Sequence, residues 1–355
     1  MSDTDDSPTP NSRPANETMR ALVLHGPRDA RVDRVAVPQP ALGELLVRIE
    51  LAGICGTDGE LAAGTMAYFA RGLTHFPLRP GHEWTGTVVA AGSASEGLWV
   101  GCRVVGDTML GCGTCPACRG GRHHVCRQRR EVGITDGWLG ALSEYAVVPT
   151  RFAHYVPDSV AAEAAVLVEP GANALRAVRA AESRPGSTLL ILGDGTIGLL
   201  AALFAVDAGA EVTVCGLRPD RLALAGRIGA RHTLTTDTAS QLPRSSYDAV
   251  LDATDDSASP ASALDLVRPG GRVALIGLAE RSSTIDTRDL VLSDVAAVGI
   301  LSGSPALADT LRAYASGLDP TPVVGDIIAL TDVPVRLAGL TSSGPGPKTL
   351  VDPWR

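Results

Sequence analysis

The stretch Leu189–Gly198, LLILGDGTIG, decides the fold of this chain. Its apolar start is typical of a buried strand, three glycines follow, and the next residues, LLAALFAVDAGA, have helical periodicity. Strand, glycine turn and helix in this order are typical of a unit that binds a dinucleotide, with the pyrophosphate at the positive end of the helix. The sequence therefore predicts an α/β fold with a doubly wound parallel sheet.

The three glycines of this turn have separate roles. Gly193 permits the tight turn, Gly195 lets the backbone approach a pyrophosphate, and Gly198 allows close packing of the helix on the strand. Alone, the motif would also fit an ordinary loop between a core strand and a core helix. Three further predicted strands, 211–217, 249–254 and 270–278, favour the cofactor site. The expected cofactor contacts are Gly193, Gly195, Thr196, Ile197, Gly198, Gly216, Arg218 and Gly277.

The end of the second predicted strand bears on the choice of cofactor. Sites for NAD place an acidic residue about 20 residues after the glycine turn, where it holds the adenosine ribose. This chain has Gly216 there, followed shortly by Arg218, whose guanidinium could bind a phosphate. The pattern favours NADP. The alternative is NAD bound through backbone contacts, with Arg218 stacked on the adenine or solvated.

The composition limits the class of protein. The chain has 355 residues, enough for two domains, with 45% hydrophobic and 20% charged residues. A net charge of -8 argues against nucleic acid as a partner, and no apolar run is long enough for a membrane span. Residues 1–18 are polar and acidic, which predicts a disordered tail on a cytoplasmic protein.

The strongest spacing in the chain is that of four cysteines in GCGTCPACRGGRHHVC. Four thiolates in one loop can close a tetrahedral shell around zinc, and such a closed shell is structural. An iron–sulfur cluster is the competing interpretation, although its usual cysteine spacing differs. We expect His123 and His124 to be surface residues rather than ligands. The predicted structural zinc lobe covers about residues 106–130, with ligands Cys112, Cys115, Cys118 and Cys126.

A second set of metal-ligand types is spread along the chain. Cys55 follows a predicted strand, and His82 and Glu83 precede another. Cysteine, histidine and carboxylate are ligands of a catalytic zinc that keeps one position open. Glu169 in VLVEPGANAL is the expected third distant ligand, because that part of the chain offers no spare cysteine. The remaining cysteines, Cys102 and Cys215, are expected to have structural roles.

With these motifs in place, the chain resembles the zinc-dependent medium-chain dehydrogenase/reductase family, the alcohol, polyol and sugar dehydrogenases. The motifs GICGTD, GHEWTG, the four cysteines, LVEP and GDGTIG occur in the order of that family. The resemblance implies a β-rich GroES-like catalytic domain interrupted by a Rossmann domain. We therefore expect catalytic segments at 19–156 and 303–355, a cofactor domain at 157–302, and a closing strand in PKTLVDP.

The resemblance also implies roles for individual residues. Cys55, His82 and Glu169 match the zinc positions, and Glu83 is a carboxylate that can bind the metal in the polyol and sugar branch. The proton-relay hydroxyl falls on Thr57. Glu60 occupies the position of the usual relay histidine, so the last relay step stays open, as does the choice between the two glutamates as direct ligands.

The same resemblance implies a small-molecule alcohol as substrate and a homodimer or homotetramer formed through the Rossmann sheets. GHEWTGTVV, VVGD and VEP are most similar to dehydrogenases of cyclitols and aminocyclitols, such as those acting on 2-deoxy-scyllo-inosamine. Two alternatives remain. One is a sugar dehydrogenase that oxidises an anomeric hydroxyl to a lactone, suggested by GTDGE, and the other is a non-catalytic NADP-binding protein that has lost its zinc.

Overall fold

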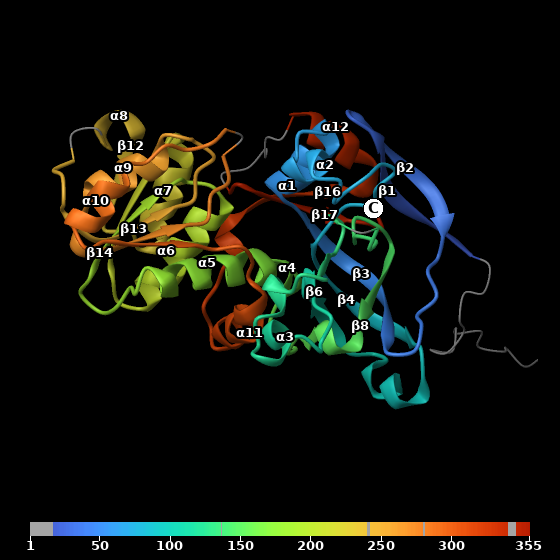
Figure 1. The fold of residues 1–355 in the computed structure, drawn as a ribbon. Coiled ribbons are helices and arrows are strands. Elements are labelled where there is room, and N and C mark those ends of the chain that lie inside the picture. Colours follow the sequence, from blue (N-terminus) through green and yellow to red (C-terminus); the bar gives the residue numbers. More distant parts are fainter. Residues whose placement is uncertain (1–16, 136, 240–241, 280, 340–345) are drawn as a thin grey trace, which may run out of the picture.

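The computed structural model describes residues 17–135, 137–239, 242–279, 281–339 and 346–355. Two large sheets organise the molecule, and Figure 1 shows them side by side with the middle of the chain in one and both ends in the other. The first sixteen residues of the predicted tail lie outside the described residues. Thr18, the last residue assigned to that tail, already begins a strand.

The sheet built from the middle of the chain is fully parallel. Its spatial order is β12-β11-β10-β13-β14-β15, so the chain starts in the centre, winds to one edge, crosses back and winds to the other. This is the doubly wound order predicted from the glycine turn. The strands are β10 (Thr188–Leu192), β11 (Glu211–Gly216), β12 (His232–Thr235), β13 (Tyr247–Asp252), β14 (Val267–Leu275) and β15 (Ala296–Gly299).

Helices cover both faces of this sheet (Figure 1). The strand β10 is buried on both sides, with Leu189, Leu190 and Ile191 fully inaccessible, which explains its unbroken apolar sequence. The order of the strands along the sheet reverses between β10 and β13. In doubly wound sheets the ligand binds in the crevice at the carboxyl ends of the strands where this reversal occurs. The helices are α5 (Val168–Ala180), α6 (Thr196–Asp207), α7 (Pro219–Ile228), α8 (Thr236–Ala239), α9 (Ser259–Leu266) and α10 (Thr287–Leu292).

The second sheet combines the first part of the chain with its C-terminal end. Its order is β16-β17-β3-β4-β5-β9, with β8 also paired to β3. The strands are β3 (Glu44–Ile54), β4 (Glu83–Ala91), β5 (Arg103–Gly106), β8 (Tyr145–Pro149), β9 (Ala153–Tyr155), β16 (Val324–Ala329) and β17 (Lys348–Asp352). The predicted closing strand is therefore β17, which pairs antiparallel with β3.

Two small antiparallel pairs and several short helices complete this half. The hairpin β1–β2 lies near the N-terminus, and β6–β7 lies in the cysteine lobe. The strands are β1 (Thr18–Gly26), β2 (Asp29–Ala36), β6 (Met109–Leu110) and β7 (Arg130–Glu131). The helices are α1 (Gly56–Ala63), α2 (Ala67–Ala70), α3 (Pro116–Arg119), α4 (Ala162–Val166), α11 (Leu307–Ala315) and α12 (Val333–Gly339).

The packing of α5 against α11 joins the two halves. Tyr314 of α11 is 5% exposed, and its hydroxyl donates a hydrogen bond of 3.2 Å to the carbonyl oxygen of Leu167. A Cβ on Gly171 would lie 2.1 Å from that hydroxyl oxygen, so only glycine permits this approach. The aromatic ring stacks on Phe204 of α6 at 6.0 Å between centroids. The start of α5, which carries Glu169, is fixed by these contacts.

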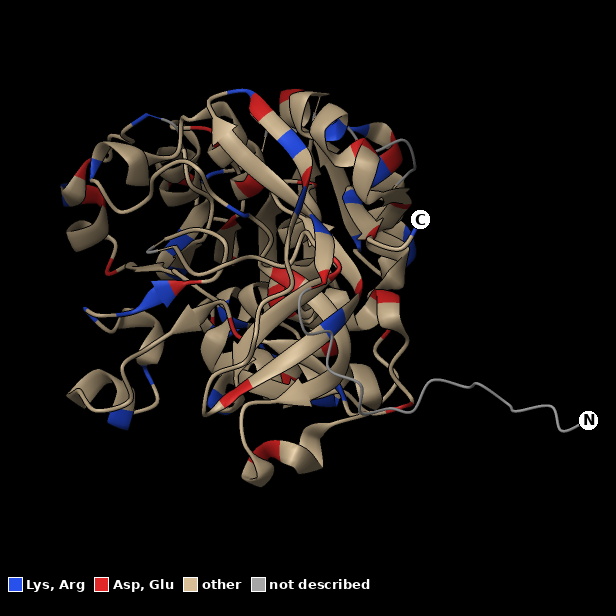
Figure 2. Cartoon of the chain, turned by 90° about the vertical axis from the view of Figure 1, so that its right-hand side faces the viewer, with Lys and Arg blue, Asp and Glu red and all other residues tan. Residues whose placement is uncertain are grey.

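Figure 2 shows basic and acidic residues interspersed over the face that it presents. Many of these charges form pairs, such as Arg31 with Asp29 on β2. Among the described residues, no helix is both long enough and apolar enough to cross a membrane.

Candidate metal centres and cofactor site

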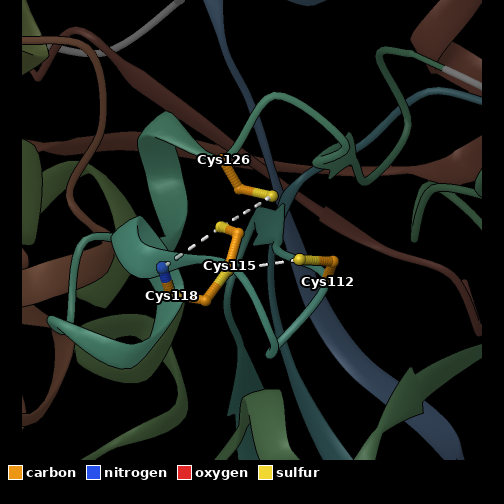
Figure 3. A group of neighbouring side chains, drawn as sticks. All are labelled: Cys112, Cys115, Cys118 and Cys126. Atoms are coloured by element: carbon orange, nitrogen blue, oxygen red, sulfur yellow. Dashed lines mark hydrogen bonds between the residues drawn. The ribbon is translucent and has the colours of Figure 1, made fainter.

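Four cysteine sulfurs converge in the lobe between β6 and β7. The sulfurs of Cys112, Cys115, Cys118 and Cys126 all lie within 4.8 Å of one another (Figure 3). Two measured separations are 3.9 Å, from Cys112 to Cys118, and 3.7 Å, from Cys115 to Cys126. A tetrahedral zinc with bonds of about 2.3 Å requires sulfur separations of about 3.8 Å. The four side chains therefore fit zinc without rearrangement.

Local hydrogen bonds lower the pKa of Cys112 and Cys115, whereas burial raises the pKa of Cys118 to about 11. Cys115 is the N-cap of α3, and its sulfur accepts a hydrogen bond of 3.5 Å from the amide of Cys118. The hydroxyl of Thr114 lies 3.5 Å from the Cys112 sulfur, and hydrogen bonding by Thr114 lowers the pKa of Cys112 to about 5. Thiolates are the form that binds zinc, so the hydrogen bonds of the loop favour the zinc-binding form of Cys112 and Cys115.

The two histidines of the lobe do not both lie on the surface as expected. His124 is only 6% exposed, and burial lowers its pKa to about 4, with the nearby Arg176 adding to the effect. The expectation of a surface position is therefore wrong for His124. His123 lies 2.6 Å from the Asp107 carboxylate, which also accepts a hydrogen bond from Ser304. These contacts attach the lobe to the segment where the chain returns from the parallel sheet.

A second cluster of ligand types lies where β3 and β4 begin to diverge. Gly53 of β3 is paired with Glu83 of β4, so Cys55 and His82 flank the same pair of strands. The ligand atoms of Cys55, His82 and Glu83 lie within 4.8 Å of one another. His82 and Glu83 are 5% and 1% exposed. The strand register thus brings together three residues that the sequence predicted as metal ligands.

Asp58 supports this cluster, although its role was missed from the sequence. One carboxylate oxygen accepts a hydrogen bond of 2.8 Å from the amide of Cys55, and the other lies 3.8 Å from Nδ1 of His82. That second oxygen and the His82 Nδ1 are buried without a hydrogen-bond partner. Carboxylates commonly orient metal-binding histidines in this way. The spacing of Asp58 three residues after Cys55, a helix N-cap pair, was the available signal.

Glu169 enters the same region from the first turn of α5. Its Oε1 accepts hydrogen bonds from the Asn173 amide, at 3.0 Å, and from the Thr108 hydroxyl, at 3.3 Å. Thr108 also lies 3.4 Å from the carbonyl oxygen of His82. Burial, aided by the nearby charge of Glu83, raises the pKa of Glu169 to about 7. Glu169 does not belong to the set of Cys55, His82 and Glu83 whose ligand atoms lie within 4.8 Å of one another. Its carboxylate is nevertheless close enough to His82 to help raise the pKa of that imidazole.

Lys348, the only lysine in the sequence, forms an ion pair at the edge of this cluster. Its Nζ donates to both carboxylate oxygens of Glu83, at 2.8 and 2.6 Å, and to the carbonyl oxygen of Ile54 at 3.0 Å. The two side chains are 3% and 1% exposed. A Cβ on Gly53 would lie 2.2 Å from Glu83 Oε2, so the glycine leaves the space that this carboxylate occupies.

The residues expected in the proton relay lie on α1. Thr57 and Glu60 are half-buried and three positions apart, which places them on neighbouring turns of one helix face. Trp84, the residue after Glu83, is 4% exposed and packs against Gly106, where any side chain would collide with its ring. Trp84 is thus a packing residue of this half.

The glycine turn after β10 has the space that a pyrophosphate needs. Gly193 has φ of 111°, and a Cβ there would lie 2.8 Å from the carbonyl oxygen of Ala253. A Cβ on Gly198 would lie 2.0 Å from the carbonyl oxygen of Gly193. A Cβ on Gly195 would meet no atom within 4 Å, so the backbone is open there. Thr196 and Ile197 begin α6, whose positive end faces the turn.

The other expected cofactor residues lie at the ends of neighbouring strands. Gly277 follows β14, and a Cβ there would lie 1.8 Å from the carbonyl oxygen of Thr254. Gly216 ends β11. Arg218 lies just beyond, with its guanidinium bound to the Asp220 carboxylate through hydrogen bonds of 3.1 and 2.8 Å.

Two family models match the chain. The alcohol dehydrogenase GroES-like domain matches residues 41–158, and the zinc-binding dehydrogenase model matches residues 196–316. The chain is 32% identical to an L-threonine 3-dehydrogenase of Chelativorans sp. (strain BNC1), over 79% of this chain and 83% of the relative. It is also 32% identical to a sorbitol dehydrogenase of Bacillus subtilis (strain 168), over 74% of this chain and 76% of the relative.

Solved structures agree with this fold class. A Sinorhizobium meliloti 1021 protein with bound NADP has a TM-score of 0.87 and 28% identity, covering 95% of this chain and 100% of that one. An alcohol dehydrogenase of Escherichia coli CFT073 complexed with NADH has a TM-score of 0.85 and 25% identity, with coverages of 95% and 100%. The predicted GroES-like and Rossmann architecture is confirmed.

The cysteine lobe can be tested by metal removal. The purified protein is expected to contain about two zinc ions per chain, and Cys118→Ser should reduce this to about one, with a lower melting temperature, because three ligands no longer close the shell. Elemental mass spectrometry after gel filtration measures both. Cys102→Ser, outside both clusters, is the control and should retain the full zinc content. Iron in place of zinc would contradict the assignment.

The buried ion pair can be tested by unfolding. Replacing Lys348 with Met leaves the Glu83 carboxylate buried without its partner, which should lower the free energy of unfolding by about 3–5 kcal/mol. The double variant Glu83→Gln with Lys348→Met should lose less than the two single losses combined. Arg31→Met, which removes an exposed ion pair, should cost about 0–1 kcal/mol. Urea denaturation is measured for the wild type, both single variants, the double variant and Arg31→Met, and additive losses would contradict coupling of the pair.

Proposed function

Because the chain belongs to the family of zinc-binding alcohol dehydrogenases, we propose that its substrate is a polyol, cyclitol or aminocyclitol. The reaction would transfer hydride between NAD(P) and a secondary alcohol or ketone of that substrate. The observation that carries the proposal is the cluster of the half-buried Cys55 with the buried His82 and Glu83, with Glu169 beside it. This donor set suits a zinc that keeps a position for substrate.

We propose that Cys55, His82 and Glu169 hold the catalytic zinc. Lys348 engages both oxygens of Glu83, which favours Glu169 as the third ligand, and no described residue donates a hydrogen bond to Glu169 Oε2. Asp58 orients the His82 ring from behind. When bound, zinc would acidify the substrate hydroxyl, and the nicotinamide would exchange hydride with the carbinol carbon.

The proton would leave through residues of α1. Thr57 would accept the hydroxyl proton of the substrate while it gives up its own hydroxyl proton, and Glu60, one helical turn further on, would take up that proton and pass it towards solvent. Both side chains are half-buried. The buried Asp58 is engaged with the amide of Cys55 and is less suited to this transfer.

The charge of the site supports a hydroxyl-rich or amine-bearing substrate. Asp58, Glu83 and Glu169 contribute three carboxylates, against the single ammonium of Lys348. With a Cys55 thiolate and a bound zinc dication included, the sum of these charges is -1, so the site would disfavour an anionic substrate and favour a protonated amine. Of the substrates in the relatives' names, sorbitol is a neutral polyol, and threonine is a zwitterion without net charge that carries an amine beside its secondary hydroxyl. An aminocyclitol combines the two features.

Substrate class can be tested with a panel. The zinc-loaded protein should reduce NAD or NADP with cyclitols, aminocyclitols or linear polyols, and the carboxylate-rich site should disfavour hydroxy acids. Absorbance at the nicotinamide band gives the rates. Cys55→Ser is the matched inactive variant, since it removes a proposed metal ligand. Turnover of glucose or galactose to a lactone alone would favour the sugar dehydrogenase alternative, and cofactor binding without turnover would favour a non-catalytic protein.

We also propose a homodimer joined through the outer strand of the parallel sheet. β15 is an edge strand, and Ala296, Ala297 and Gly299 on it are exposed. The preceding helix exposes Val291 and Leu292, which are 79% and 84% accessible. Exposed apolar residues beside an unpaired strand edge are suited to pairing with a second copy. A larger assembly, the homotetramer also expected, would need a second contact.

The dimer can be tested by introducing charge on this surface. Val291→Asp with Leu292→Asp should convert the dimer to a monomer, because two copies would bring four carboxylates together, while the exposed positions leave the fold intact. Sedimentation velocity measures the mass. Leu98→Asp, at a residue that is 91% exposed in the short 3-10 helix Ala94–Trp99 between β4 and β5, should remain dimeric. A dimer that survives the double change would contradict this interface.

A further inference from the structure

We propose that Asp194 recognises the adenosine ribose of the cofactor in place of the acidic residue missing at position 216, and that the chain therefore binds NAD in preference to NADP. The inference rests on the proposed nicotinamide-dependent function and concerns one part of its site. Asp194 lies between the first two glycines of the turn after β10. Its partner position, Gly216, ends the adjacent parallel strand β11.

The Asp194 side chain fills the volume that a side chain at position 216 would need. A Cβ on Gly216 would lie 2.4 Å from Cβ of Asp194 and 2.5 Å from its Oδ2. An acidic residue at 216 and the aspartate at 194 are thus mutually exclusive in this backbone. A carboxylate therefore does lie at the end of β11, but it belongs to Asp194 in the glycine turn after β10.

Hydrogen bonds fix the orientation of this carboxylate. Oδ2 accepts from the backbone amides of Leu217, at 2.9 Å, and of Arg218, at 2.7 Å. No described residue donates a hydrogen bond to Oδ1, whose nearest recorded cation is Nη1 of Arg221 at 4.0 Å. Asp194 is 6% exposed, so its carboxylate is held in a nearly buried position beside the glycine turn. Oδ1 is therefore available to accept hydrogen bonds from the two ribose hydroxyls.

The surroundings offer little to a 2′-phosphate. The two amides that could bind it are already used by Asp194. Arg218, which favoured NADP in the sequence, is engaged in a two-point ion pair with Asp220. The four charged side chains here, Arg218, Arg221, Asp194 and Asp220, sum to zero. A phosphate dianion would thus approach a fixed carboxylate without a net positive field.

Cofactor binding provides the test, independently of turnover. The zinc-loaded protein is titrated with NADH and with NADPH, and dissociation constants are taken from nicotinamide fluorescence. Wild type should bind NADH more tightly by about tenfold or more, the effect of hydrogen bonds to a charged group. Asp194→Asn, which removes the charge at nearly constant shape, should weaken NADH binding by about tenfold and leave NADPH binding unchanged or stronger.

Two further variants separate recognition from loop structure. Asp220→Asn releases Arg218 but keeps Asp194, so it should strengthen NADPH binding and leave NADH binding unchanged. The exchange of the two positions, Asp194→Gly with Gly216→Asp, returns the carboxylate to the usual position and should restore the NADH preference that Asp194→Asn loses. The single change Gly216→Asp is unsuitable, because its side chain would collide with Asp194.

The outcomes distinguish this proposal from the function on which it rests. Equal or tighter binding of NADPH by wild type would overturn the preference for NAD, and unchanged NADH binding in Asp194→Asn would overturn the role of Asp194. Failure of wild type to bind either nucleotide would overturn the proposed dehydrogenase function itself. Loss of binding of both nucleotides in the exchange variant, with a native melting temperature, would also count against ribose recognition by a carboxylate here.

Discussion

The ion pair between Lys348 and Glu83 is the constraint on which the arrangement of the metal site depends. A buried carboxylate beside other carboxylates is costly unless a cation lies within hydrogen-bonding distance. Lys348 supplies that cation from a strand 265 positions away in the sequence, and it does so only when β17 pairs with β3 in the observed register. The same register aligns Gly53 with Glu83. The pairing of β17, β3 and β4 and the neutralisation of Glu83 by Lys348 therefore require the same strand register.

This constraint also explains how the parallel sheet can be inserted into the other half. The chain leaves the first sheet after β9, builds the whole cofactor unit, and returns in β16 and β17. Besides the packing of α11 against α5, two contacts hold the returning segment: the buried Lys348, and the contact of Ser304 with Asp107 beside the cysteine lobe. Both lie close to proposed metal ligands. The contacts that connect the returning segment to the first half of the chain therefore lie beside the proposed metal sites.

The sequence predicted what local spacing determines, and it missed what tertiary contacts determine. The glycine turn and the four cysteines are short patterns whose geometry follows from the residues themselves, and the fold class follows from their order. His124 was misplaced because its burial depends on a distant segment near Arg176. Lys348 and Asp194 carried signals, as the only lysine and as an acid within a glycine turn. The roles of Lys348 and Asp194 can be inferred only from the structure, which places Lys348 beside Glu83 and Asp194 beside Gly216.

The proposed catalytic cluster holds more negative charge than its protein surroundings compensate. Burial raises the pKa values of both Asp58 and Glu169, which means that their ionised forms are disfavoured here without a further cation. One ammonium, from Lys348, is committed to Glu83. A divalent cation bound by Cys55 and His82 would relieve the remaining repulsion and would restore Glu169 to its ionised form. The excess of buried carboxylates is therefore a physical reason for this fold to bind a dication, independent of any motif.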